Sequence, residues 1–176
     1  NEFKERWSNS LSSYRVMVKI VAGGRRRQDS VANGLRHLEG QADIVLVHDA
    51  VRPIITREMI ETVIQKTEEK GAAILAVPVQ ATVKEVDGVQ RIIRTVKRDG
   101  LWMAQTPQGF KKDIILQAYQ ALDQEGAEVT DDAQAVERLG YPVEIVPGSY
   151  TNIKITTPED LRLATAILQG PLNTAS

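Results

Sequence analysis

Four short segments of the sequence combine residue types that bind charged ligands. The first, Gly23-Gly24-Arg25-Arg26-Arg27-Gln28-Asp29-Ser30, follows an apolar run and opens a helical pattern. Glycines let the backbone approach a flat or anionic ligand, and a helix N-terminus offers free N–H groups. The segment therefore fits a loop that binds a flat or anionic ligand, and it fits equally a plain turn flanked by solvated arginines.

The second segment, His48-Asp49-Ala50-Val51-Arg52-Pro53, follows the apolar run Ile44–Val47. In open α/β sheets, ligands bind beyond the carboxyl ends of the strands. A carboxylate at such a place commonly holds a divalent cation on a nucleotide, and an arginine suits a phosphate. The alternative is that Asp49 caps a helix and pairs with Arg52. His48 is expected to be structural, because the chain has 2 histidines and the other lies at no metal-ligand spacing.

The third and fourth segments carry further cations. Arg94, Lys97 and Arg98 lie in a β-prone stretch, where such residues usually form a solvated face, and Trp102 beyond them suits packing. Lys154 stands between two isoleucines, just before the helix start Thr157-Pro158-Glu159-Asp160. A lysine in that place is costly unless its amine meets an anion, which favours a binding role.

Composition excludes several functional classes. The 176 residues include 22 Lys and Arg against 23 Asp and Glu, so the net charge of -1 gives no support for nucleic-acid or polybasic membrane binding. The absence of cysteine removes disulfides, thiolate metal sites and cysteine nucleophiles, and it fits a reducing cytoplasm. No apolar run approaches the ~20 residues that span a bilayer. No signal peptide opens the chain, which begins at Asn1 without an initiator Met, so we expect its start to be a fragment boundary or a processed end.

Short β-branched runs alternate with helical patterns along the chain, which predicts one α/β domain over residues 1–176 with helices on both faces of a doubly wound, mostly parallel sheet. The expected strands are 16–21, 44–47, 73–77 and 142–146, and the expected helices are 29–38, 56–67, 115–122, 130–139 and one that starts at Thr157. The run Ile44–Val47 is almost wholly apolar, so we expect it to be the central strand.

The pattern changes between Val79 and Arg98, where β-prone residues are mixed with charges. Asp87-Gly88 between two such runs predicts a β-hairpin. In a monomer its exposed apolar side chains and strand edges would face water. We therefore expect a projecting arm, over about 79–100, that joins two copies of the chain into a homodimer.

Three motifs occur in an order that resembles one enzyme family. They are His-Asp-Ala-Val-Arg-Pro at 48–53, Leu-Trp-Met-Ala-Gln-Thr-Pro-Gln at 101–108 and Asn-Ile-Lys-Ile-Thr-Thr-Pro-Glu-Asp-Leu at 152–161. This pattern resembles the 2-C-methyl-D-erythritol 4-phosphate cytidylyltransferases from about Val16 to Leu168. The sister family of ribitol-5-phosphate cytidylyltransferases shares the first and third motifs. The arm residues 95–102 resemble the erythritol family more closely.

The resemblance implies a Rossmann-like nucleotidyltransferase that acts in non-mevalonate isoprenoid synthesis, in the bacterial cytoplasm or, in a plant, the plastid stroma. Its partners would be CTP, a polyol phosphate, Mg²⁺ and a second copy of the chain, with no nucleic acid and no membrane. By the same resemblance, a catalytic pair positions the sugar phosphate: Arg98 and Lys154. Further contacts to that phosphate are implied for Thr82, Arg52 and Thr106. A last set would hold the nucleotide, its final member also lying near Mg²⁺: Gly23, Gly24, Arg27, Ser30 and Asp49.

One departure separates this sequence from the family pattern. The family begins with a strand and a loop of the form Ala-Ala-Gly-x-Gly-x-Arg, followed by a Lys, which wraps the triphosphate. Nothing of that form precedes Val16, so the resemblance implies an enzyme chain that lacks this segment. Two other classes therefore stay open: a CTP-binding module without activity, and an interaction protein whose arm is only a dimer clasp.

Overall fold

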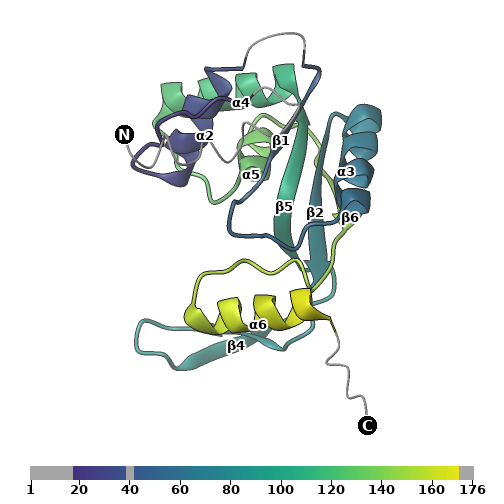
Figure 1. Ribbon diagram of the computed structural model, residues 1–176. Coiled ribbons are helices and arrows are strands. Elements are labelled where there is room, and N and C mark those ends of the chain that lie inside the picture. The colour runs from purple at the N-terminus through teal and green to yellow at the C-terminus, as the bar shows by residue number, and fades with distance from the viewer. Residues whose placement is uncertain (1–17, 39–41, 171–176) are drawn as a thin grey trace. The chain divides into compact units, whose positions relative to one another are not determined.

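The computed structural model describes residues 18–38 and 42–170, and the described residues up to Ala42 and from Asp43 onward belong to two separate compact units (Figure 1). In the first unit an irregular segment leads into α2 (Arg27–Leu35). The predicted strand 16–21 is wrong for its described part, because residues 18–21 are not in a strand and have no partner strand to bond their backbone. Val16 lies outside the described residues. The single-domain prediction stays a prediction.

The second unit contains the sheet and the remaining helices. In chain order its elements are β1 (Ile44–Val47), α3 (Arg57–Lys70), β2 (Ala72–Pro78), β3 (Val83–Val86), β4 (Ile92–Val96), β5 (Trp102–Lys111), α4 (Lys112–Glu125), α5 (Asp132–Glu137), β6 (Glu144–Pro147) and α6 (Pro158–Gln169). The α/β class is confirmed. No helix in the described residues is both long and apolar enough to cross a membrane.

Helices cover both faces of the four-stranded sheet, as expected, with α3 on one side and α4 and α5 on the other (Figure 1). Residues Ala72–Val77 of β2 are buried throughout, which is typical of a strand covered on both faces. On the α3 side, Val63 packs into a buried cluster with residues of β2 and β6: Ala73, Leu75 and Val146. This burial makes β2 the rigid element from which the neighbouring loops are positioned.

The sheet is mixed, so the expectation of a mostly parallel sheet is wrong for the described strands. Its order is β1-β5-β2-β6, with β5 antiparallel to both neighbours and only β6 parallel to β2. Ile44–Val47 therefore lies at an edge of the described sheet and not at its centre. The reason is β5, which enters between β1 and β2. Its glutamines, its glycine and Pro107 lower its β-propensity, which is why the sequence did not predict a strand there.

A bulge interrupts the pairing of β5 with β2. The register passes from Ala76 opposite Ala104 to Ile74 opposite Gln108, so one residue of β2 faces residues 105–107 of β5. Proline, which has no N–H, is tolerated in sheets at such bulges. Bulges also redirect side chains next to binding sites. This one takes residues 105 and 106 out of the regular ladder, and both side chains contact segments outside the sheet.

The predicted hairpin is confirmed as β3 and β4, which form a separate two-stranded sheet. Asp87 closes its turn, because its Oδ1 accepts hydrogen bonds from the backbone N–H of Val89 (3.0 Å) and Arg91 (2.8 Å). Figure 1 shows this arm standing off from the four-stranded sheet. Ile92 is 63% exposed and Ile93 58%, so the arm presents apolar side chains to solvent.

Gly109 of β5 lies directly against α3. A Cβ at this position would lie 2.4 Å from Thr67 Oγ1 and 2.8 Å from Val63 Cγ1, and both of those side chains are fully buried. We expect Gly109→Ala to lower the free energy of unfolding in urea by about 1–3 kcal/mol, as overpacking of a core does. Gly34→Ala in α2 is the control, because its Cβ would meet no atom within 4 Å. Equal stability of the two variants would contradict this packing.

Candidate functional site

A carboxylate that pairs with two cations, Asp49, follows the carboxyl end of β1, and one of those cations, Lys154, lies in the segment after β6. Asp49 Oδ2 is 3.1 Å from Lys154 Nζ and 3.7 Å from Arg52 Nε. The Asp49 and Arg52 side chains are only 14% and 12% exposed, whereas that of Lys154 is 41% exposed. These three groups have a formal charge of +1, and the lysine amine is the member that solvent reaches most easily.

Arg52 is a buried cation, and one of its side-chain nitrogens, Nε, has no hydrogen-bond acceptor among the described residues. Its Nη1 donates to the Asn152 carbonyl oxygen (2.7 Å), but no described residue accepts a hydrogen bond from its buried Nε. Burial lowers the pKa of the Arg52 guanidinium, and the nearby Asp49 carboxylate opposes that shift. A buried donor without an acceptor is costly, so this geometry favours an additional anion beside Arg52.

The sequence left open whether Asp49 caps a helix and pairs with Arg52. The pairing is present, but the cap is not, because the N-cap of α3 is Thr56, whose Oγ1 accepts a hydrogen bond from Met59 N (3.2 Å). Asp49 therefore keeps its carboxylate at the end of the sheet and directs it toward Lys154.

The loop that carries Asp49 is held by hydrogen bonds within the loop and by others to β5. The Arg52 N–H donates to the Asp49 carbonyl oxygen (3.0 Å), and His48 Nε2 lies 3.1 Å from the Arg52 carbonyl oxygen. From the bulge of β5, Thr106 Oγ1 accepts from the Asp49 N–H (3.0 Å) and lies 3.0 Å from His48 Nδ1. These contacts fix the backbone from which the Asp49 carboxylate projects.

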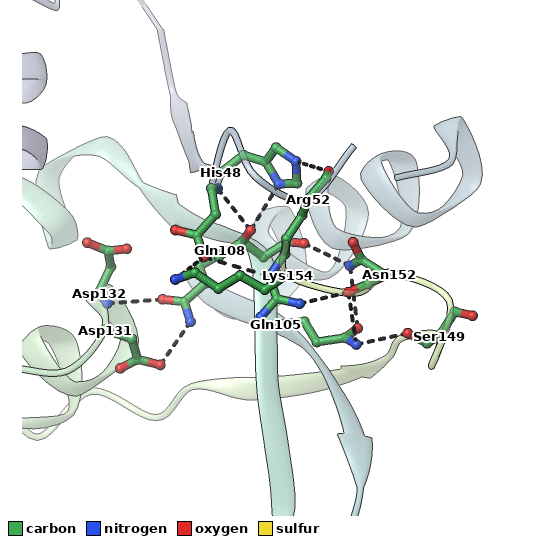
Figure 2. Close-up of polar contacts among 11 residues, drawn as sticks. His48, Arg52, Gln105, Gln108, Asp131, Asp132, Ser149, Asn152 and Lys154 are labelled. Carbon is green, nitrogen blue, oxygen red and sulfur yellow. Dashed lines mark hydrogen bonds and ion pairs between the residues drawn. The ribbon is translucent and has the colours of Figure 1, made fainter. Parts of the chain in front are cut away.

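A second set of polar contacts fixes the segment that carries Lys154 (Figure 2). Asn152 is fully buried, and its Nδ2 donates to the Thr106 carbonyl oxygen (3.0 Å) and weakly to Gln105 Oε1 (3.4 Å). Gln105 Nε2 donates to the Ser149 carbonyl oxygen (2.8 Å). The sequence analysis assigned no role to Asn152 or Gln105. The available signal in the sequence was the pair of glutamines Gln105 and Gln108, which both lie in a four-residue stretch that the structure buries.

The second glutamine, Gln108, orients the start of α5. Its Nε2 donates to Asp131 Oδ2 (2.9 Å), and its Oε1 accepts from the backbone N–H of Asp132 (3.1 Å) and Ala133 (3.0 Å). Gln108 is 1% exposed, and Asp132 is fully buried, accepting a hydrogen bond from the Tyr119 hydroxyl. This buried network, which the sequence did not single out, joins α4, α5 and β5 behind the site.

The structure brings together four of the predicted site residues: Asp49, Arg52, Thr106 and Lys154. Two others, Thr82 and Arg98, lie at the base of the arm, where both are exposed. The Arg98 guanidinium donates to the Gln80 carbonyl oxygen, a contact within the arm itself. Within one described copy of the chain, Arg98 is therefore bound to the arm and not to the Asp49 carboxylate.

The remaining predicted residues belong to the first compact unit. The Gly24 N–H donates to Ser30 Oγ (2.9 Å), and that hydroxyl donates to the Arg26 carbonyl oxygen (3.3 Å), so Ser30 closes the loop before α2. A Cβ on Gly24 would lie 2.2 Å from the Asp29 Cβ, which explains the glycine. The predicted loop at a helix start is present, with Gly23 exposed beside it and Arg27 as the first residue of α2.

The fit of a divalent cation depends on Asp49. No group of three or more His, Asp or Glu among the described residues could hold a metal ion by itself. Mg²⁺ is commonly bound through one or two carboxylates together with the phosphates of a substrate. Asp49 fits that arrangement as a single carboxylate, although its Oδ2 is paired with Lys154 in this state.

The start of α6 holds the segment downstream of Lys154 through hydrogen bonds, and it forms the helix cap that the sequence predicted at Thr157. Asp160 Oδ2 accepts from the Thr156 N–H (2.9 Å), the Thr156 hydroxyl (2.9 Å) and the Thr157 N–H (2.8 Å), and the Thr157 side chain accepts from Asp160 N (3.2 Å). The hydrogen bonds from Thr156, followed by those from Thr157, lower the pKa of Asp160 to about 2.

This cap predicts a specific pH dependence. Because the folded pKa of Asp160 is below its ordinary value, the ionised carboxylate stabilises the fold above about pH 4, and that contribution is lost as pH falls toward about 2. In urea denaturation, Asp160→Asn should be less stable than the parent at neutral pH, and the difference should shrink over that acid range. Glu159→Gln removes a charge from the same turn without removing the cap, so a difference of equal size there would contradict the assignment.

The mixed α/β sheet covered on both faces, with a projecting hairpin, matches the Rossmann-like nucleotidyltransferase fold of the solved structures on which the chain superimposes. The family model described as 2-C-methyl-D-erythritol 4-phosphate cytidylyltransferase matches residues 4–170. The chain therefore belongs to the 2-C-methyl-D-erythritol 4-phosphate cytidylyltransferase family.

Individual relatives agree with this assignment. The enzyme of that name from Syntrophus aciditrophicus (strain SB) is 54% identical over 150 residues, which are 85% of this chain and 64% of that protein. The one from Alkaliphilus oremlandii (strain OhILAs) is 46% identical over 168 residues, 96% of this chain and 71% of that protein. The chain thus spans about two thirds of the length of these relatives.

Among solved structures, the 4-diphosphocytidyl-2C-methyl-D-erythritol synthase of Anaerococcus prevotii superimposes with a TM-score of 0.87 at 34% identity, covering 96% of this chain and 78% of that one. The 2-C-methyl-D-erythritol 4-phosphate cytidylyltransferase of Thermus thermophilus gives 0.78 at 39% identity, covering 84% and 71%.

Proposed function

We propose that the protein transfers the cytidylyl group of CTP to 2-C-methyl-D-erythritol 4-phosphate, giving 4-diphosphocytidyl-2-C-methyl-D-erythritol and pyrophosphate. The observation that carries this proposal is the placement of Lys154 and Arg52 around Asp49, with a buried Arg52 Nε that no described residue bonds. Such a site suits a phosphate group that replaces Asp49 as the partner of the lysine amine and accepts a hydrogen bond from the Arg52 guanidinium.

The chemistry needs positioning and charge more than it needs a base. A phosphate oxygen of the sugar attacks the α-phosphorus of CTP, the bond from that phosphorus to the bridging oxygen breaks, and pyrophosphate leaves. The nucleophile is already an anion, so no general base and no covalent intermediate are required. Catalysis then consists of holding two repelling anions in line and stabilising the charge of the transition state.

Each residue of the site has a part in this proposal. Lys154 and Arg52 hold the sugar phosphate, and Asp49 keeps the lysine amine in place until that phosphate arrives. When Mg²⁺ is bound, it supplies positive charge to the nucleotide phosphates, and Asp49 is the carboxylate that would hold it. In the first unit, the loop at Gly23 and Gly24, with Arg27 and Ser30, is proposed to hold cytosine through backbone and hydroxyl groups.

The arm is proposed to complete the site of a second copy of the chain. Ile92 and Ile93 are more than half exposed, and the two arm strands pair only with each other among the described residues. Clasping two arms about a two-fold axis would bury these side chains. It would also carry Thr82 and Arg98 across the interface toward the partner's sugar phosphate. A cytoplasmic location is part of the same proposal.

The decisive experiment measures pyrophosphate release by the intact protein with CTP and Mg²⁺. Release with 2-C-methyl-D-erythritol 4-phosphate at a rate far above that with ribitol 5-phosphate supports the proposal. The reverse preference would assign the protein to the sister activity. CTP binding by calorimetry without release would indicate a binding module, and no nucleotide binding at all would favour an interaction protein.

A further inference from the structure

We propose that His48 is a positioning residue, which holds the Thr106 hydroxyl and thereby the Asp49 backbone through a neutral imidazole protonated on Nε2. His48 thus acts through Thr106 and Asp49 and needs no contact with a substrate of its own. The catalytic part of this inference rests on the proposed function, whereas its structural part does not.

The tautomer of His48 follows from its two partners. His48 Nε2 lies 3.1 Å from the Arg52 carbonyl oxygen, which can only accept, so Nε2 carries the hydrogen. In a neutral ring Nδ1 is then an acceptor, and its partner at 3.0 Å, Thr106 Oγ1, must be the donor. The imidazole therefore bridges a backbone carbonyl of the loop and a hydroxyl of the sheet.

The Thr106 hydroxyl is consequently both a hydrogen-bond donor and a hydrogen-bond acceptor. It donates its only hydrogen to His48, and it accepts from the Asp49 N–H at 3.0 Å. Thr106 is 4% exposed, and it stands in the bulge of β5, where it faces the 48–52 loop. The hydroxyl therefore anchors the 48–52 loop to β5.

The anchor matters because Asp49 sets the position of the cations. Its carboxylate is the shared partner of Lys154 and Arg52, and its backbone is held by the Thr106 hydroxyl. A shift of the loop would move the carboxylate and release the lysine amine from its place. Misplacement by about 1 Å can cost on the order of a hundredfold in rate.

The chain offers an internal control for the tautomer. Its other histidine, His37, places Nδ1 at 2.7 Å from the Asn33 carbonyl oxygen, so its hydrogen must be on Nδ1. The two histidines are thus expected in opposite neutral tautomers. Long-range ¹H–¹⁵N correlation spectra at mildly alkaline pH distinguish these forms, and His37→Gln assigns the two signals.

We expect the His48 signals to have the Nε2–H pattern and the His37 signals the Nδ1–H pattern. Thr106→Val should shift the Nδ1 resonance of His48, because the donor to Nδ1 is gone, while the Arg52 carbonyl oxygen keeps the hydrogen on Nε2; Thr106→Ser should leave both resonances in place. An Nδ1–H tautomer at His48, or an unmoved Nδ1 resonance in Thr106→Val, would overturn the assignment whether or not the protein is an enzyme.

The activities of His48 variants distinguish the effects of the two hydrogen bonds that the His48 ring makes. Asparagine at 48 can still accept near the Nδ1 position, and glutamine can still donate near the Nε2 position. We therefore expect His48→Gln to lose about tenfold to a hundredfold in kcat, as loss of a supporting partner does, and His48→Asn to lose less. Thr106→Ser should retain more activity than Thr106→Val, and the double variant H48Q/T106V should be no worse than Thr106→Val alone.

Several outcomes would overturn the proposal. Equal kcat in His48→Gln and His48→Asn, at equal thermal stability, would show that the Thr106 contact does not matter for the reaction. Additive losses in the double variant would mean that His48 and Thr106 act independently, so that His48 does not act through the Thr106 hydroxyl. If the parent protein releases no pyrophosphate, the proposed function fails, while the spectra still decide the tautomer.

Discussion

Replacing Lys154 by alanine is expected to lower turnover of the intact protein with the polyol phosphate by about two to three decades, or roughly 2–4 kcal/mol of transition-state stabilisation. The amine is 3.1 Å from Asp49 Oδ2 and is the most exposed of the three charges, so it is the cation that can exchange partners with an incoming phosphate. Steady-state kinetics and calorimetric CTP binding together measure the effect. CTP affinity should change far less than turnover.

Lys66→Ala is a suitable control, because Lys66 is a lysine of α3 that pairs only with Glu69 among its described neighbours. It should keep full activity. A Lys154→Ala variant that loses CTP affinity as strongly as turnover would place the lysine on the nucleotide. Unchanged turnover would remove Lys154 from the mechanism.

The second large effect is a recovery of activity when two inactive variants of the protein are mixed. Arg98→Ala and Lys154→Ala should each be nearly inactive, the first because it removes a guanidinium that is proposed to act across the dimer. In a heterodimer of the two, one site carries both defects and the other carries neither. Random exchange of subunits should therefore restore about a quarter of the parent activity, as expected for a two-fold dimer with shared sites.

The matched control is Arg94→Ala, which removes another arginine of the arm, one paired at 2.5 Å with Glu85. It should be active alone and should not need a partner. A mixture that stays inactive after subunit exchange has been demonstrated by mass spectrometry would put Arg98 and Lys154 in the same subunit's site. The arm would then have no part in the reaction.

Much of the local structure followed from the sequence. Thr56 and Thr157 cap the helices that their positions predicted, and Asp87-Gly88 forms the turn of the arm. These features depend on residues close together in the chain, where capping and turn chemistry act directly. The apolar run Ala73–Val77 was also predicted as a strand, because a continuous run of such residues indicates a strand by itself.

The tertiary structure decided the features that depend on distant segments. Residues 102–111 form the strand that lies between β1 and β2 and pairs with both. The residue types of this segment have a low β-propensity, so the sequence alone does not indicate a strand there. That insertion makes the sheet mixed and moves Ile44–Val47 to its edge. The bulge of the same strand presents Gln105 and Thr106 to loops that are more than forty residues away in the chain.

The candidate site divides in the same way. Asp49, Arg52 and Lys154 could be named from the sequence, because charged residues next to buried runs need a partner or a ligand. That Asp49 would be the shared partner of both cations, with Asn152 and His48 holding the two loops against β5, depends on contacts between residues that are 46 to 100 or more positions apart in the chain. The sequence determined which groups can do the chemistry, and the packing of β5 between β1 and β2 decided where those groups meet.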